Sequence, residues 1–187
     1  FSMDIENFSE MIKHIKTIIS LKKWECVMKI NPMNVKLRPV KQNDWKFILD
    51  IRNQEVVRKA CYDTSIIDYS THEKYMHKLD NTPNCHQWII VCDNKDVGQA
   101  KVDDLVFGYM LSPEYRGKGI WISAYPLVLK EVKKMGYTKL KGTVKFNQKK
   151  LLEIALSLGF IKTGIKSKDG EHVGYDMEKN LEWIFYA

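Results

Sequence analysis

The sequence predicts an α/β (α+β) domain in which helices flank a mixed central sheet. Segments with strand and helix patterns follow one another in the order β-α-α-β-β-β-α-β-α-β-β. Turn signals at residues 93–96 and at Asp169-Gly170 connect pairs of neighbouring strands. The chain has 187 residues, of which 44% are hydrophobic and 28% charged. These values are typical of one well-packed globular domain.

The first part of the chain predicts an appended helix followed by the start of the sheet. Apolar residues recur with a helical period over residues 4–21, and "NPMN" at 31–34 breaks that pattern. "VKLRPV" at 35–40 then has the composition of a first strand. We therefore expect residues 1–34 to be an N-terminal helical extension or the tail of a preceding domain, and residues 35–187 to form the main domain.

Two helices are predicted next, separated by a long loop. Asn43 can cap a helix over residues 44–52. Ser70 and Glu73 fit a capping box that opens a second helix, which ends near Leu79. Residues 53–69 between them have no clear period, and long loops inside domains are often functional.

The remaining elements alternate more regularly. Strands are expected at 87–93, 97–103 and 105–111, followed by a glycine-rich turn and a helix that ends near Lys134. A strand at 139–144 precedes a helix at 148–158, which Gly159 closes. Residues 160–180 are predicted to form a final hairpin.

Charge and cysteine content narrow the function classes. The net charge is +7, and between Arg116 and Lys150 the only acid is Glu131. A basic segment of this kind suits a polyanionic ligand. Aromatic stacking motifs for nucleic acid are absent, and no apolar run is long enough to cross a membrane.

The four cysteines are scattered without metal-ligand spacing, so we expect reduced thiols, no metal site and a cytoplasmic protein.

The turn "EYRGKGIWISAYP" at 114–126 carries the clearest chemical signal. A strand ends before Pro113, and Gly117 and Gly119 allow a sharp turn into a helix. Free N–H groups and the partial positive charge at a helix start form an anion site. Arg116 and Lys118 add charge beside it, so the turn predicts a phosphate cradle.

The chain from about Val35 to Lys179 resembles the GNAT (Gcn5-related N-acetyltransferase) superfamily. The resemblance rests on "LRPV", "VGQAKV", "LSPEYRGKG" and "VKFNQKKLLEIALSLGFIKTG". It implies a GNAT-like, mostly antiparallel central sheet flanked by helices, and acetyl-CoA as the cofactor. "IRNQEVVRKACYDTSIIDYSTHEKYMHKL" at 51–79 is similar to acetyltransferases of nonulosonic (pseudaminic-type) sugar synthesis, which act on nucleotide-linked amino sugars. Similar modules can follow a nucleotide-sugar hydrolase domain, and a homodimer is possible.

The resemblance implies a set of cofactor-binding residues. The strand end would meet the pantetheine arm and thioester, the glycine turn would bind the pyrophosphate, and the segment after the next strand would contact the far side of the cofactor. In chain order these residues are Leu111, Ser112, Arg116, Gly117, Lys118, Gly119, Ile120, Trp121, Asn147 and Lys149.

Three positions depart from the family pattern. Trp121 occupies a position that is small in relatives, and its side chain could crowd a diphosphate. Pro126 would remove a hydrogen bond from a helix that begins at Gly119. Ser123 could instead cap a delayed helix, with the indole facing outward. Ala155 stands where many relatives have a tyrosine that protonates the leaving thiolate.

Candidate catalytic and substrate residues are less specific. Tyr109 can face the cleft from the central strand, and core packing is its alternative role. His86 stands at a strand start, where it could be catalytic or structural. Arg52 and Asn53 are the candidates for binding the acceptor, with simple helix capping as the alternative.

Three functions follow from these features. The first is an acetyl-CoA-dependent N-acetyltransferase that acts on a nucleotide-linked amino sugar in surface glycan synthesis. The second is a protein N-terminal acetyltransferase of the ribosomal type. The third, suggested by Trp121, Pro126 and Ala155, is a degenerate module that binds a partner or CoA without turnover.

Overall fold

The computed structural model describes residues 33–181. Seven strands of this part of the chain form one sheet in the order β1-β2-β3-β4-β5-β7-β6. The predicted helix at 4–21 lies outside the described residues. The strands are β1 (Val35–Pro39), β2 (Cys85–Cys92), β3 (Lys95–Asp103), β4 (Val106–Leu111), β5 (Lys139–Lys145), β6 (Ile161–Lys168) and β7 (Glu171–Asn180). The helices are α2 (Trp45–Asn53), α3 (Glu55–Arg58), α4 (Tyr69–Asp80), α5 (Ile120–Lys134) and α6 (Lys149–Ser157), with 3-10 turns η1 (Gln42–Asp44) and η2 (Pro113–Tyr115).

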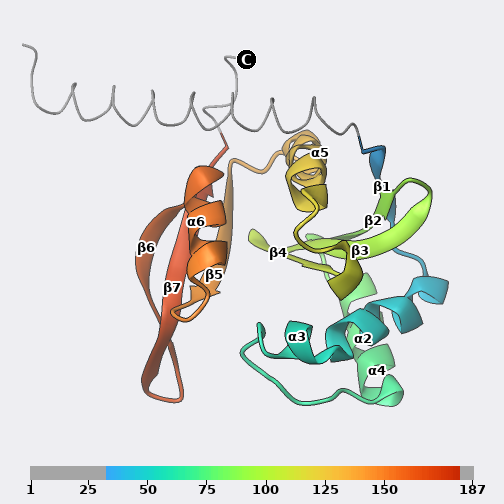
Figure 1. The fold of residues 1–187 in the computed structure, drawn as a ribbon, viewed down its shortest axis with the longest axis horizontal. Coiled ribbons are helices and arrows are strands. Elements are labelled where there is room, and N and C mark those ends of the chain that lie inside the picture. The colour runs from blue at the N-terminus through green and yellow to red at the C-terminus, as the bar shows by residue number, and fades with distance from the viewer. Residues whose placement is uncertain (1–32, 182–187) are drawn as a thin grey trace, which may run out of the picture.

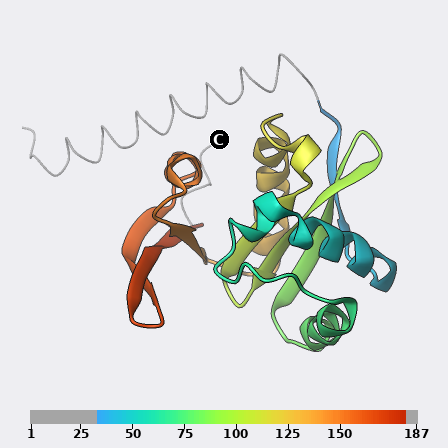
Figure 2. The same ribbon diagram turned by 60° about the horizontal axis from the view of Figure 1, so that its bottom comes forward.

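The sheet consists of two antiparallel parts that meet at one parallel pair. β1 to β4 form a meander, and β5, β7 and β6 form the second part. β4 and β5 run parallel and are paired only through Val106 and Lys141. Beyond that pair the two parts diverge, as Figures 1 and 2 show. The predicted mixed, mostly antiparallel sheet is confirmed.

Helices cover both faces of the β1–β4 part because successive strand residues point to opposite faces. In β2, Trp88 and Ile90 pack with residues of α5 such as Val128 in the larger core cluster. Ile89 points the other way and packs with Trp45 of α2 and Met76 of α4. In Figure 1, α5 therefore lies on one side of these strands and α2 and α4 lie on the other.

The helix starts differ in detail from the sequence predictions. Asn43 lies inside η1 and does not cap α2, so that prediction is wrong. The carboxylate of Asp44 instead accepts a hydrogen bond from the Lys41 N–H (2.8 Å). The cap of α4 is Asp68, whose side chain accepts from the Thr71 N–H (2.9 Å), and not Ser70. The short helix α3 lies in the segment predicted as loop.

Helix α5 begins directly at the glycine turn. It runs unbroken from Ile120 to Lys134, with Gly119 as its N-cap and Pro126 inside it. The prediction of a delayed helix capped by Ser123 is therefore wrong. Pro126 is exposed, so water can bond the Ile122 carbonyl that the missing N–H leaves free. None of the helices between residues 33 and 181 is long and apolar enough to cross a membrane.

Candidate active site

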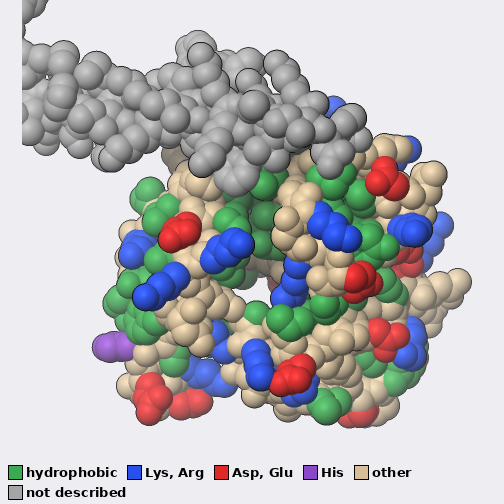
Figure 3. Space-filling model, in the orientation of Figure 1, with side chains coloured by type: hydrophobic (Ala, Val, Ile, Leu, Met, Phe, Trp, Pro, Cys, Tyr) green, Lys and Arg blue, Asp and Glu red, His purple; other side chains and the backbone are tan. Residues whose placement is uncertain are grey.

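A cavity opens where β4 and β5 separate. It has a volume of about 490 Å³ and is hereafter called the donor cavity. Figure 3 shows this face hollowed between the two parts of the molecule, with blue Lys and Arg side chains near the opening. Its lining comes from β4, β5, α6 and the loop after α3, and includes Cys61, Tyr62, Tyr109, Arg116, Lys145, Gln148 and Ala155.

The β3–β4 register directs the backbone N–H and C=O groups of alternate β4 residues away from β3, toward this gap. The Ser112 N–H donates to the Val97 carbonyl (2.9 Å), which makes that pair a hydrogen-bonded one. Because pairs alternate in an antiparallel ladder, the N–H and C=O groups of Leu111 and Tyr109 point away from β3. The Leu111 backbone is thus placed for the predicted contact with an extended ligand. Both backbone groups of Ser112 are already bonded within the chain, since its carbonyl accepts from the Tyr115 N–H (3.0 Å).

The turn at 116–119 adjoins the donor cavity through Arg116, which lines it. Gly117 and Gly119 have φ values of +73° and +80°, which side-chain-bearing residues rarely adopt. Among the described residues, the N–H groups of 117–121 donate to no backbone carbonyl, and those of Ile120 and Trp121 belong to the first turn of a 15-residue helix. The Arg116 Nε donates to the Leu111 carbonyl (3.1 Å). These groups, with the side chain of Lys118, could hold an anion, and we refer to them as the anion site.

Trp121 does not crowd that turn. Its side chain is only 5% exposed and lies under β4, stacked on Tyr109 with ring centroids 3.7 Å apart and planes 3° from parallel. The prediction of an outward-facing indole is wrong. Because the indole belongs to the core, only the backbone N–H of Trp121 faces the anion site, beside that of Ile120.

Two further predicted cofactor residues lie at the start of α6. Asn147 follows β5, and Lys149 is the first residue of the helix. Gln148 between them donates from its side chain to the Ala60 carbonyl (3.2 Å). This bond ties the loop after α3 to the opposite wall of the donor cavity.

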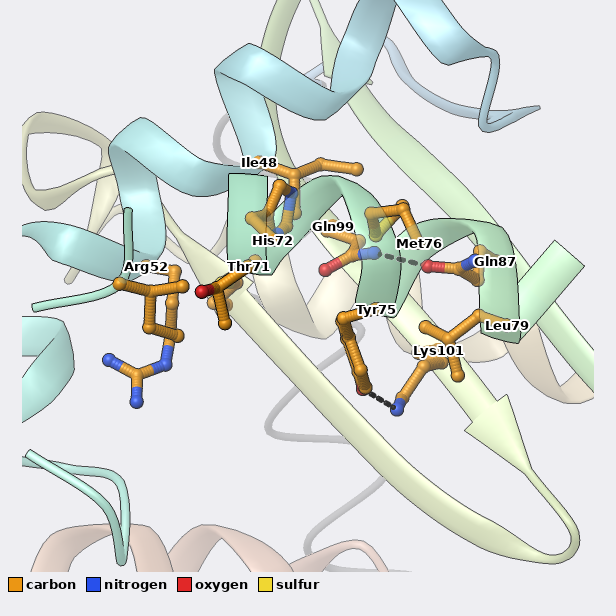
Figure 4. A pocket seen from close by; sticks show the side chains of 12 residues that line it. Ile48, Arg52, Thr71, His72, Tyr75, Met76, Leu79, Gln87, Gln99 and Lys101 are labelled. Atoms are coloured by element: carbon orange, nitrogen blue, oxygen red, sulfur yellow. Dashed lines mark hydrogen bonds between the residues drawn. The ribbon is translucent and has the colours of Figure 1, made fainter. Parts of the chain in front are cut away.

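A second cavity, of about 330 Å³, lies between the sheet and helices α2 and α4; we refer to it as the acceptor cavity (Figure 4). Four residues line both cavities and form the junction between them: Arg52, Gln99, Lys101 and Met110. Gln99 donates to the Gln87 side chain (2.8 Å), and the Lys101 Nζ donates to the Tyr75 hydroxyl (2.8 Å). A ligand in one cavity can therefore reach a ligand in the other.

Arg52 and Asn53 have different roles at this junction. The Arg52 Nη2 donates to the Asp63 carbonyl (2.7 Å), and its Nη1 is buried without a hydrogen-bond partner among the described residues. Asn53 donates to the Ile67 carbonyl (2.7 Å) and accepts from the Ile67 N–H (3.0 Å). Arg52 can bind a ligand, whereas Asn53 fixes the loop that borders the acceptor cavity.

The two predicted catalytic residues are not brought together. Tyr109 lines the donor cavity, and burial, partly opposed by Arg116, raises its pKa to about 12. His86 contacts the rings of Trp88 and Tyr137 and lines neither cavity. Tyr109 therefore keeps its proton at neutral pH, and this arrangement offers no support for a catalytic His86.

Comparison with known proteins agrees with this geometry. Residues 34–161 match the family model described as an acetyltransferase (GNAT) domain. The chain belongs to the GNAT acetyltransferase family. No curated protein gives a significant match. The fold of the chain is also seen in solved structures, and the three described next are each below 25% identity.

Three such structures illustrate the fold. A domain from Methanocaldococcus jannaschii DSM 2661 is 24% identical, with 79% of this chain and 99% of that chain covered and a TM-score of 0.69. Spermidine N-acetyltransferase from Vibrio cholerae, in complex with CoA and spermine, is 16% identical, with coverages of 79% and 95% and a TM-score of 0.70. A putative phosphinothricin N-acetyltransferase is 15% identical, with coverages of 79% and 99% and a TM-score of 0.66.

GNAT enzymes use acetyl-CoA, and the residues present here fit it. A Cβ atom built on Gly117 would meet nothing within 4 Å, so the turn leaves room for a phosphate group. The N–H groups of 117–121, which donate to no backbone carbonyl among the described residues, and the Arg116 side chain supply donors, and the donor cavity extends from Arg116 along β4.

Sequence reasoning missed polar residues that line the acceptor cavity. Gln99 and Lys101 alternate on β3, and that spacing in "VGQAKVD" could have indicated a shared polar face. No pattern in the sequence around His72 indicated that this residue would be buried between two helices. It lies only 4% exposed in α4, and its Nε2 donates to the Trp45 carbonyl of α2 (3.0 Å).

Proposed function

We propose that this GNAT enzyme acetylates the amine of an anionic small molecule, and specifically of a nucleotide-linked amino sugar of nonulosonic-acid-type glycan synthesis. One observation carries the proposal: Arg52 and Lys101 stand at the junction, and the described lining of both cavities contains no Asp or Glu. A ligand with phosphate groups would be attracted by such a surface.

The same observation argues against a polyamine acceptor. A polyamine is a polycation, and its ammonium groups need carboxylates to replace the water that they lose on binding. The cavities offer Arg52, Lys101, Arg116 and Lys145 instead. The similarity to spermidine N-acetyltransferase is therefore one of fold, and the substrate proposed here differs.

Binding of the cofactor is assigned to the strand end and the glycine turn. The N–H groups of 117–121, with the Arg116 and Lys118 side chains, would hold the pyrophosphate. The Leu111 backbone would meet the pantetheine arm, and Asn147 and Lys149 would contact the remainder. When bound, acetyl-CoA supplies an acetyl group activated as a thioester, which passes to the amine while the thiol is released.

The chain contributes positioning and polarisation to this reaction. Donors fixed in a strand can stabilise negative charge that develops on a carbonyl oxygen, and the Leu111 N–H points into the donor cavity. Tyr109 is assigned as the group that would give a proton to the leaving thiolate, since its phenol lines this cavity and is protonated at neutral pH, although burial, which raises its pKa to about 12, makes it a weaker acid. The attacking nitrogen would lose its proton to solvent, from which Tyr109 would be reprotonated. It lines the same cavity as Ala155, where the usual tyrosine is missing. His86 receives no role in this proposal.

Acceptor assays test the function directly. The protein should acetylate UDP-glucosamine with acetyl-CoA, and do so faster than it acetylates a peptide amine or spermidine. Turnover of the peptide alone would replace the proposal with protein N-terminal acetylation. Binding of acetyl-CoA with no turnover of any amine would instead support a degenerate module.

A further inference from the structure

The junction of the two cavities carries positive charge at the point where an acceptor amine must react. Arg52 and Lys101 belong to different elements, α2 and β3, and each lines both cavities. In Figure 4 their side chains lie on either side of Thr71 and Tyr75, which α4 contributes. An amine that moves from the acceptor cavity toward the donor cavity passes these two cations.

Both groups keep their charge at neutral pH. An arginine side chain does not lose its proton in proteins. Burial alone would lower the pKa of Lys101, but its hydrogen bonds to Tyr75 and Asp103 raise it above the ordinary value. The Nζ–Oδ2 distance to Asp103 is 3.3 Å, and Asp103 lines neither cavity.

We propose that Arg52 and Lys101 hold the acceptor amine in its neutral, nucleophilic form, so that the enzyme needs no dedicated general base. The proposal rests on the acetyltransferase function given above. An ammonium group beside a fixed cation is destabilised, and one cation about 7 Å away at an effective dielectric constant of 20 lowers the amine's pKa by roughly 1–2. The amine gives its proton to solvent before it reacts.

The other groups that face the junction do not cancel this field. His72 on α4 is neutral near pH 7, because burial lowers its pKa and its Nε2–H bonds the Trp45 carbonyl. The remaining charged or titratable groups are Tyr75 on α4, Cys85 on β2, Asp103 on β3, Tyr109 and Arg116 around β4, Lys145 on β5, and Cys61 and Tyr62 in the loop after α3. Two carboxylates act on the pair from outside both cavities. Asp103 is bonded to Lys101. Asp63 is exposed to solvent, its charge interacts with Arg52, and its carboxylate accepts hydrogen bonds from the N–H and hydroxyl groups of Ser65.

Calorimetry of the enzyme–CoA complex tests the proposal without turnover. Titration with UDP-glucosamine in two buffers of different ionisation enthalpy counts the protons released on binding, and a pH series gives the pKa of the bound amine. At a pH one unit below the pKa of the free amine, binding of UDP-glucosamine to the wild-type protein should release about one proton per site. A bound-amine pKa equal to or above that of the free amine would overturn the proposal.

Two variants of opposite sign separate a charge effect from a structural one. Lys101→Met should raise the pKa of the bound amine by about 1, whereas Asp103→Asn should lower it. In Lys101→Arg the pKa of the bound amine should match that of the wild type, because the charge is kept. Lys46→Met is the matched control and should also match it, since the exposed Lys46 side chain pairs with Asp50 on α2. Shifts in the same direction for Lys101→Met and Asp103→Asn would show that altered packing, and not charge, is responsible.

The probes also distinguish this inference from the proposed function. If UDP-glucosamine does not bind but phosphoethanolamine binds with the same opposite shifts, the amino-sugar assignment is wrong and the inference holds. If UDP-glucosamine is acetylated but binds without releasing protons, the function holds and the inference fails. Binding of spermidine as a full cation would overturn both.

Discussion

The indole ring of Trp121 lies flat against the phenol ring of Tyr109, with centroids 3.7 Å apart. Phe107 continues the stack, 5.3 Å from the indole. This contact joins the first turn of α5 to β4, so one side chain connects the anion site to the strand that borders the donor cavity. The sequence suggested that Trp121 could crowd a diphosphate, but in the structure its side chain is part of the core that supports the glycine turn.

Replacing Trp121 should therefore cost stability and should not improve cofactor binding. Trp121→Ala removes a buried aromatic side chain, which lowers the free energy of unfolding by about 3–5 kcal/mol. Chemical denaturation measures that loss, and calorimetric titration with acetyl-CoA should show equal or weaker binding. Trp121→Phe keeps an aromatic ring on Tyr109 and should lose less. A clear gain in acetyl-CoA affinity for the alanine variant would contradict this assignment.

Arg116 should contribute strongly to acetyl-CoA affinity. Arg116→Met removes a cation from the donor cavity and the hydrogen bond to the Leu111 carbonyl. Loss of a charged hydrogen bond of about 1.5–3 kcal/mol weakens binding by roughly 10- to 100-fold. Lys134→Met is the matched control, since Lys134 lies at the far end of α5 and pairs with Glu131. Equal affinities for the two variants would place the pyrophosphate elsewhere.

Asn53 should act through the loop that it holds. Asn53→Ala removes both hydrogen bonds to Ile67, at a cost of about 1–3 kcal/mol in the free energy of unfolding. Because Ile67 lines the acceptor cavity, KM for the acceptor should rise more than KM for acetyl-CoA. Asn81→Ala removes only a local bond to the His77 carbonyl and serves as the control. A change confined to acetyl-CoA would refute the loop assignment.

His72 should make stability depend on pH in a defined window. Burial lowers its pKa below the ordinary value of 6.5, so the unfolded chain binds a proton first as the pH falls. Stability is therefore full above about pH 6.5 and decreases as the pH falls toward the lowered pKa. In His72→Gln this decrease should be smaller, as measured by urea denaturation between pH 5 and pH 8. His172→Gln, at an exposed position, should keep the wild-type slope.

The order of elements and the phosphate turn were predictable from local patterns. The segments "QWIIVCD" and "VGQAKVD", with the "DNKD" turn between them, predict the hairpin of β2 and β3, and the glycines at 117 and 119 predict the turn before α5. These signals are local, because they depend on side-chain period and backbone freedom over a few residues. Helix caps were less predictable. Asp68 caps α4 where the pattern favoured Ser70, since several polar residues at a helix start can serve as the cap.

The sequence by itself determined the order of the strands and longer helices along the chain and the glycine turn before α5, because each follows from residues close together in the chain. Only the tertiary structure decided that Trp121 is buried on Tyr109, that His86 lies outside both cavities, and that Arg52 and Lys101 meet at their junction. Arg52 and Lys101 are brought together by the packing of α2 against β3. No local period encodes such a meeting, since it depends on which faces the helices bury.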